Sequence, residues 1–359
     1  MALTTPPAGG EEAAPTASAA AGVSAATGRR RRRLVDSLKT LVFIFASAAV
    51  CLIALSNTVT WHAQEFWGAS GDFWEKSWLF VRYALGDNDY VIGVWGSWAV
   101  IQVVYWAWSF AFLFVDWLDA DCFKRYKIQP EQQASGAEVR HAVARVAFNH
   151  VVVGLPFNHV VYELMRWRGC SLGSQLPTFQ RALLEMVVFV CMEEVGFYYA
   201  HRLVHQPALY KSVHKMHHEW TAPIALISVY AHPVEHVVAN MLPLTLGPLL
   251  CGSHVATIWL WLAIAIFSTI VSHCGYHVPF LPSPEAHDFH HLRFNQNFGV
   301  LGVLDRLHGT DGQFRQSKQY QRHFMTLSLE PVRVSIPDDP KKSNSPTPSP
   351  KPSTSRQQH

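Results

Sequence analysis

Long apolar stretches separated by short polar segments determine the architecture expected of this chain. Residues 41–59 and 91–115 are nearly continuous apolar runs. A helix rises about 1.5 Å per residue, so each run is long enough to cross a bilayer core of about 30 Å. We therefore expect two membrane-spanning helices in the first third of the chain.

The apolar stretches that follow differ in how often polar residues interrupt them. Residues 142–162 include Arg145, Asn149, His150 and Asn158, so exposing the whole stretch to lipid would be costly. We expect a re-entrant or protein-covered segment there.

Three more apolar stretches lie further along, at 182–199, 236–250 and 255–272. We expect the first to span the membrane. Turn-forming residues at 251–253 separate the last two, and this predicts a hairpin within the membrane. No series of short alternating strands, as in a lipid-spanning barrel, is present. The expected fold class is all-α, an integral membrane helical bundle.

The two ends of the chain have a different composition. The N-terminal segment is rich in Ala, Gly, Thr and Pro, the C-terminal tail is rich in Pro, Ser and Lys, and neither has enough large apolar residues to offset the entropy of ordering. Five arginines at 29–33 precede the first predicted span, which places the N-terminus in the cytosol by the positive-inside rule. The expected organisation is a disordered segment at 1–34, transmembrane and re-entrant helices at 35–180, a histidine-rich domain at 181–315, an extension at 316–335 and a disordered tail at 336–359.

Composition supports a membrane protein. Charged residues make up 15% of the chain, against about 25% in a typical soluble domain. Apolar residues reach 49%, and the net charge of +3 is too small to indicate nucleic acid as a partner. The six cysteines are scattered without a C-x-x-C pair, so neither a disulfide framework nor a thiolate metal site is expected.

Histidines gather in the second half of the chain with a repeated spacing. The boxes HRLVH and HCGYH hold two each at i and i+4, while HKMHH and HDFHH hold three each at i, i+3 and i+4. In a helix these separations place the imidazoles of one box on one face. The candidate metal ligands are the ten box histidines: His201, His205, His214, His217, His218, His273, His277, His287, His290 and His291.

A lone histidine on an apolar face is usually a hydrogen-bonded core residue, but four matching boxes point to metal. Burying so many imidazoles without purpose would be costly, whereas neutral imidazole is a good ligand for first-row transition ions. Ten ligands exceed the needs of one ion, so two ions are expected. The predicted hairpin returns the chain to the same face between His218 and His273, so all boxes can meet at the cytosolic membrane edge.

These boxes and their neighbours resemble a known superfamily. FYYAHRLVH, HKMHHEWTAP, YAHPVEH, HCGYH and HDFHHLRFNQNFG occur in that order and resemble the fatty acid hydroxylase and sterol desaturase superfamily of membrane di-iron enzymes. HKMHHEWTAP and YAHPVEH are most similar to its sterol C4-methyl oxidase branch. The resemblance implies that the ten box histidines hold the metal. Further candidates, as ligands or as groups that orient the imidazoles, are His232, His236, Glu194, Asp288, Asn297 and Asp305.

The resemblance also implies the reaction and its partners. It implies a di-iron oxygenase that hydroxylates or oxidises a lipid C–H bond, with a sterol as substrate and O2 as co-substrate. Electrons would come from cytochrome b5 and its NAD(P)H-dependent reductase, in the endoplasmic reticulum membrane. A separate donor is also expected because the chain has no dinucleotide-binding G-x-G-x-x-G motif and no His-Pro-Gly-Gly haem motif.

Several alternatives remain open at this stage. An all-imidazole shell also suits zinc or copper. A fatty-acyl or sphingolipid hydroxylase, or a desaturase, would use the same ligands around a different pocket. A metal transporter would string ligands through the membrane depth, and a non-catalytic metal-binding regulator would keep the ligands without turnover.

Overall fold

The computed structural model describes residues 73–339 continuously, together with isolated positions between 39 and 65. The arginine run, most of the first predicted span at 41–59 and the tail from 340 lie outside the described residues. Within 73–339 no strand forms, and one bridge between Lys127 and Tyr276 is the only β-type pairing. The predicted all-α fold class is therefore confirmed.

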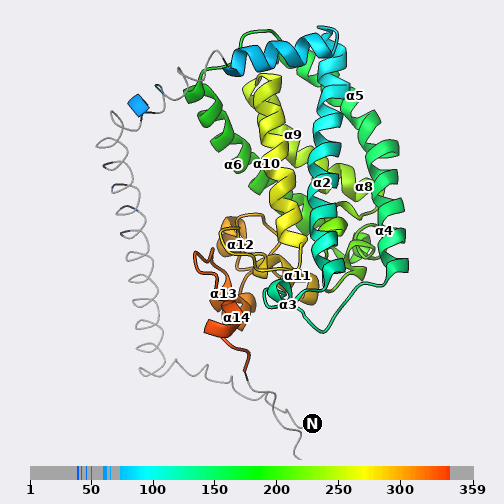
Figure 1. Cartoon of the computed structure of the whole chain (residues 1–359), viewed down its shortest axis with the longest axis vertical. Helices are drawn as coiled ribbons and strands as arrows, with labels where there is room; N and C mark the ends of the chain where they lie inside the picture. Colours follow the sequence, from blue (N-terminus) through cyan, green and yellow to red (C-terminus); the bar gives the residue numbers. More distant parts are fainter. Residues whose placement is uncertain are drawn as a thin grey trace, which may run out of the picture. The chain divides into compact units, whose positions relative to one another are not determined.

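The described part of the chain is a series of helices (Figure 1). Residues 73–84 form the first described helix. The elements that follow are η1 (Val91–Gly96), α2 (Ser97–Leu118), α3 (Asp121–Lys124), α4 (Gly136–Phe148), η2 (Asn149–Gly154), α5 (Leu155–Arg168), α6 (Phe179–Val204), α7 (Pro207–Leu209), η3 (Tyr210–His214), η4 (His217–Glu219), η5 (Ala225–Val229), α8 (Pro233–Glu235), η6 (His236–Met241), α9 (Leu242–Cys251), α10 (Val255–His273), α11 (Glu285–Arg293), α12 (Val303–His308), η7 (Phe314–Gln316), α13 (Lys318–Arg322) and α14 (Val332–Ser335).

Among the described residues, three helical segments are long and apolar enough to cross a membrane. They are Val91–Leu118, Pro233–Cys251 and Val255–His273. They coincide with the apolar stretches predicted at 91–115, 236–250 and 255–272. The prediction of a helical membrane protein is therefore confirmed.

A tight turn joins α9 to α10. Gly252 has a φ of 60°, a left-handed conformation that glycine adopts readily. The Ser253 backbone N–H donates to the Pro248 carbonyl at 3.1 Å, which closes the end of α9. His254 then caps α10, because its Nδ1 accepts from the Ala256 N–H at 3.1 Å. The predicted hairpin of two apolar helices is present.

Helix α6 packs lengthwise against α9. Gly247 lies so close to α6 that a Cβ atom there would stand 2.6 Å from the Phe189 Cα, and small residues allow such close approach of membrane helices. The predicted stretch at 182–199 lies within α6. However, α6 is not one of the three candidate spans, because Glu185, Glu193 and Glu194 interrupt its apolar run.

The stretch at 142–162 lies in a long helical segment that runs without a break through α4, η2 and α5. The chain therefore does not re-enter at this point. Asn149, His150 and Asn158 are buried against protein, while Val151 and Val152 are about half exposed. The polar residues are accommodated by facing the bundle, as expected for a segment that protein covers on one side.

The short helices that follow the hairpin gather at one end of the bundle. Figure 1 shows α11, α12 and α13 beside the end of α10. Helices α6 and α10 both end there, and α12 packs on α6 while α11 packs on α10. The histidine-bearing helices α6, α10 and α11, which are far apart in sequence, therefore meet at this end.

Candidate metal centre

The structure brings nine of the ten box histidines into two compact clusters. Within each cluster one nitrogen from every imidazole lies within 4.8 Å of all the others. The first cluster consists of His201, His205, His214, His218 and His290, and the second of His217, His273, His287 and His291. Seven of the nine side chains are buried, while His205 in the first cluster and His287 in the second are partly exposed.

The three-histidine boxes each serve both clusters. In HKMHH, His214 and His218 belong to the first cluster and His217 to the second. In HDFHH, His290 belongs to the first cluster, and its neighbours at 287 and 291 to the second. The ring centroids of His218 and His291, one from each cluster, are 5.0 Å apart. The two clusters are therefore adjacent parts of one site.

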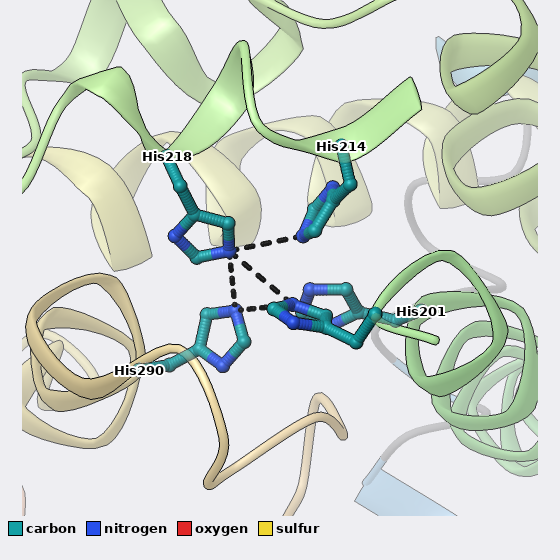
Figure 2. Close-up of side chains that lie close together, drawn as sticks. His201, His214, His218 and His290 are labelled. Atoms are coloured by element: carbon teal, nitrogen blue, oxygen red, sulfur yellow. Dashed lines mark hydrogen bonds between the residues drawn. The ribbon is translucent and has the colours of Figure 1, made fainter. Parts of the chain in front are cut away.

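The first cluster converges on the Nε2 atom of His218. This atom lies 3.0 Å from the His214 Nε2, 3.2 Å from the His205 Nε2 and 3.1 Å from the His290 Nε2. Figure 2 shows the rings of His214, His218 and His290 turned toward one another, with His201 beside them. Three of the four boxes thus supply nitrogens to one small volume.

The second cluster is a series of imidazoles with His273 and His287 at its middle. Their Nε2 atoms are 2.8 Å apart. The His217 Nε2 lies 3.4 Å from the His273 Nε2, and the His291 Nε2 lies 3.2 Å from the His287 Nε2.

Backbone carbonyls fix the protonation of five of these imidazoles. A carbonyl can only accept, so each Nδ1 that it contacts must carry the proton, and the Nε2 of that neutral ring must carry a lone pair. The Nδ1 atoms donate as follows: His201 to Phe298 at 2.8 Å, His290 to Gln296 at 2.7 Å, His217 to Tyr230 at 3.1 Å, His273 to Thr269 at 2.7 Å and His291 to Trp220 at 2.9 Å.

The lone pairs that result fit metal ions. The His217 and His273 Nε2 atoms face each other at 3.4 Å, and neither can donate while both Nδ1 atoms hold the proton. Two facing acceptors repel, whereas a cation bound by both turns the contact into a favourable one. The carbonyl contacts also fix the ring orientations, as groups behind metal-bound histidines usually do. The donor set therefore fits two ions of a metal that accepts imidazole.

Burial keeps these rings in the form that binds metal. It lowers the pKa of His214 to about 3 and the pKa of His217 to about 4. Burial, followed by repulsion from neighbouring histidines, also holds the pKa of His290 and of His291 well below the ordinary value. Imidazole binds metals as the neutral base, so these ligands need no deprotonation at neutral pH.

The carboxylate of Glu235 contacts the site, although Glu235 was not among the candidate residues predicted from the sequence. The His214 Nδ1 donates to the Glu235 Oε1 at 2.7 Å, and both side chains are almost fully buried. A carboxylate behind a ligating imidazole raises its basicity. The available signal was an acidic residue inside YAHPVEH, at the start of an apolar stretch.

His277 lies in neither cluster. Helix α10 ends at His273, and Gly275 follows with a φ of 75°, so His273 and His277 do not share a helix face as the box spacing assumed. Instead the His277 Nε2 donates to the Phe324 carbonyl at 3.0 Å, while its Nδ1 lies 3.5 Å from the Glu285 Oε1. The structure gives His277 protein partners rather than a place among the converging nitrogens.

Neither histidine of YAHPVEH joins a cluster. His232 caps α8, because its Nδ1 accepts from the Val234 N–H at 3.2 Å. His236 is buried, and its Nδ1 has no hydrogen-bond partner among the described residues.

The other candidate orienting residues act on the backbone around the clusters. Glu194 accepts from the backbone N–H groups of Val300, Leu301 and Leu304. Asp305 accepts from the Phe298 N–H at 2.8 Å. Both carboxylates therefore hold the loop whose Phe298 carbonyl orients His201.

Asp288 and Asn297 hold the region around α11. Asp288 accepts from the side-chain amides of Gln129 and Gln319, and Asn297 donates to the Ala286 carbonyl at 2.9 Å. Burial raises the pKa of Asp288 to about 7. In the part of the chain that the structure describes, none of the four predicted orienting residues forms a hydrogen bond with a clustered imidazole.

A largely apolar cavity leads from the second cluster into the bundle. His273 and His287 line one part of it, and residues of several helices line the rest, among them Gly93 of η1, Met165 of α5 and Phe197 of α6. A cavity of this form suits an elongated apolar molecule whose reacting carbon lies beside the clusters.

The fold and the two clusters define a helical membrane protein with a histidine-lined site suited to two metal ions. The family model described as fatty acid hydroxylase matches residues 186–310. Fatty acid hydroxylase domain-containing protein 2 of Macaca fascicularis is 46% identical over 309 residues, which cover 85% of this chain and 93% of that protein. Its Homo sapiens counterpart is 45% identical over the same length.

More distant relatives show how widely the family varies. Methylsterol monooxygenase 2-2 of Arabidopsis thaliana is 30% identical over 258 residues, which cover 68% of this chain and 95% of that protein. No solved structure has a significant match to the chain. The chain belongs to the fatty acid hydroxylase family, as the sequence resemblance predicted, and it is a membrane oxidoreductase of that family.

Proposed function

We propose that this protein is a di-iron oxygenase that hydroxylates or oxidises a C–H bond of a membrane lipid, with a C4-methylated sterol as substrate. The observation that carries the proposal is the apolar cavity that begins at His273 and His287 and continues among the helices of the bundle. The similarity to methylsterol monooxygenase 2-2 of Arabidopsis thaliana supports the sterol assignment. Such a substrate would enter from the bilayer with its reacting carbon toward the clusters.

The protein's own contribution would be to hold the metal ligands and to exclude water. All ten box histidines were expected as ligands, and the nine clustered ones are those that we propose hold iron, with zinc as an alternative occupant. Bound iron would supply the chemistry that uses O2 to break an unactivated C–H bond. The backbone carbonyls behind the rings would keep their nitrogens aimed at the ions, and the apolar lining would keep the reacting carbon dry and fixed.

The proposal also covers the catalytic region, the electron donor and the orientation of the protein in the membrane. We assign catalysis to residues 181–315, because all nine clustered histidines lie between 201 and 291. Cytochrome b5 with its NAD(P)H-dependent reductase would supply electrons, in the endoplasmic reticulum membrane. The N-terminus and the metal centre would face the cytosol, as the arginines at 29–33 indicate.

Metal analysis of the purified protein, together with lipid profiling of cells that lack it, tests the proposal. We expect about two iron ions per chain and an accumulation of C4-methylated sterols in the deficient cells. Incubation with 18O-labelled O2 should place the label in a hydroxylated product. Accumulation of a fatty-acyl or sphingolipid precursor instead would move the substrate assignment to that class, and an unlabelled alkene product would indicate a desaturase. A metal-loaded protein that oxidises no lipid with a competent electron donor would contradict the enzyme assignment.

A further inference from the structure

The apolar cavity contains a group of polar side chains that the metal clusters do not use. Gln102 on α2, His150 on η2 and His236 on η6 all line the cavity. His150 and His236 are each 4% exposed, and their ring centroids are 6.4 Å apart. Polar groups buried in an apolar cavity are costly unless they are paired. The hydrogen-bonding atoms that have no protein partner therefore indicate which chemical group a bound ligand must carry.

The orientation of the Gln102 amide follows from its neighbours. The Trp106 indole N–H can only donate, and it lies 3.0 Å from the Gln102 Oε1. The amide oxygen must therefore face Trp106, which leaves the Nε2 group directed elsewhere. That Nε2 group is buried and has no hydrogen-bond partner among the described residues. It is an available donor.

The same amide oxygen fixes the tautomer of His150. The His150 Nδ1 lies 3.0 Å from the Gln102 Oε1, so Nδ1 carries the proton and donates. In the neutral ring the His150 Nε2 is then an acceptor. Trp106, Gln102 and His150 thus form a chain that ends in one donor and one acceptor at the cavity.

His236 places this polar group near the metal centre. It directly follows Glu235, the residue whose carboxylate accepts from the His214 Nδ1. The His236 Nδ1 is buried and has no partner among the described residues. The cavity that Gln102, His150 and His236 line is the same one that His273 and His287 line, so a ligand held by this polar group would extend toward the second cluster.

The charges along the cavity restrict the ligand further. Among its described lining residues are Glu193 and several histidines but no lysine or arginine. An anionic carboxylate or phosphate held by Gln102, His150 and His236 would find no cationic side chain in the lining, which also contains Glu193. A hydroxyl group is neutral and can both accept from Gln102 and donate to an imidazole nitrogen.

We propose that Gln102, His150 and His236 form a recognition site for a neutral hydroxyl group of the lipid, and that this contact positions the carbon to be oxidised. The proposal rests on the proposed lipid oxygenase function and deepens it by naming the polar group that the substrate must carry. A sterol or a long-chain alcohol can supply that hydroxyl, while a free fatty acid or an acyl phosphate ester cannot.

Binding measurements on the full chain in phosphatidylcholine nanodiscs test the inference. The probes are tritiated lanosterol with its 3-deoxy analogue, tritiated octadecanol with octadecane, and stearic acid. For at least one pair we expect the hydroxylated member to bind about tenfold more tightly, because the analogue leaves buried polar groups unpaired. The pair with the larger ratio identifies the source of the hydroxyl, and stearic acid should bind more weakly than octadecanol.

Two conservative variants assign the preference to the named residues. Gln102→Met and His150→Phe retain the size of each side chain but remove the donor or the acceptor, and each should lower the hydroxyl preference to about threefold or less. Ile101→Val alters the neighbouring lining without changing its hydrogen-bonding groups, so it should affect both members of a pair equally. Thermal unfolding and metal content identify a variant that has failed to fold.

The outcomes separate this inference from the proposed function. Equal binding of both members in both pairs would overturn the hydroxyl site, as would a preference that survives both variants or stearic acid binding as tightly as octadecanol. None of these results depends on turnover. Absence of lipid oxidation by the metal-loaded protein would instead remove the oxygenase function and leave the measured binding preference standing.

Discussion

The Nδ1 atom of His214 donates to the Oε1 atom of Glu235 at 2.7 Å, and neither side chain is exposed by more than 3%. Because the carboxylate occupies Nδ1, the Nε2 atom of His214 is left facing the first cluster. A buried carboxylate would be costly here without a cationic partner. A metal ion bound through the imidazole would supply that positive charge.

Replacing Glu235 by glutamine should therefore weaken metal binding at the first cluster. Glu235→Gln keeps the shape and an acceptor oxygen but removes the charge, and we expect a loss of about 10-fold to 100-fold in affinity. Metal content after dialysis against graded chelator measures the effect. Glu163→Gln is the matched control, since Glu163 is exposed and pairs with Arg166 on the surface. Unchanged affinity in Glu235→Gln would show that the carboxylate does not act through the metal.

His290 and His291 are sequence neighbours that belong to different clusters. Each single alanine variant should lower the metal content from about two ions toward one per chain, because each removes a ligand from one site and leaves the other site complete. The double variant should lose most of both. Metal analysis of the three purified proteins checks this prediction. A loss of both ions in each single variant would mean that the two sites form only together.

A variant of His277 tests whether the spacing of the histidine boxes or the geometry of the structure identifies the ligands. The spacing predicts that His277 binds metal, whereas the structure places it in neither cluster. Its ring nitrogens are occupied by the Phe324 carbonyl and by Glu285, away from both clusters. His277→Gln should therefore keep about two ions per chain, whereas His273→Gln should lose the second-cluster ion. Metal-to-protein ratios of the two variants decide the matter. Loss of an ion in His277→Gln would place it among the ligands after all.

The membrane-spanning helices could be predicted from the length and composition of the apolar stretches. The apolar stretches at 91–115, 236–250 and 255–272 were long enough to be identified, and each is a helix that could span a membrane. The stretch at 142–162 was harder, because its polar residues alone do not show which way they face. The structure turns Asn149 and Asn158 inward within one long helical segment.

The site was predictable where regular spacing persists and not where the backbone departs from it. In HKMHH and HDFHH, positions at i and i+4 do converge on one cluster. The helix ends at Cys274 and Gly275, before His277. The spacing of the histidines alone does not show where the helix ends. The groups behind the imidazoles are mostly backbone carbonyls, such as those of Tyr230 and Trp220, which no residue type encodes.

Removing the metal should destabilise the protein. The Nε2 atoms of His217 and His273 are both acceptors at 3.4 Å, so the apo form must leave them facing each other or rearrange the site. Chelation should lower Tm, and adding iron or zinc should restore it, because a ligand that binds only the folded state stabilises it by mass action. Thermal unfolding in detergent measures this, with equimolar magnesium as a control, since that ion prefers oxygen ligands. An unchanged Tm at complete metal loss would contradict a contribution of the metal to folding.

The contact between α6 and α9 makes a prediction about stability that does not involve the metal. A Cβ atom at Gly247 would lie 2.6 Å from the Phe189 Cα, and because that atom belongs to the backbone it cannot move aside by a change of rotamer. Gly247→Ala should push the two helices apart and cost about 1–3 kcal/mol. Gly136→Ala is the matched control, since its Cβ would meet only the Arg140 Nη1 at 3.5 Å. Thermal or denaturant unfolding of both variants in the same detergent should show a loss for Gly247→Ala alone. An equal effect in both would mean that the helices adjust to the added methyl group, and that the close approach is not needed to hold α6 against the hairpin.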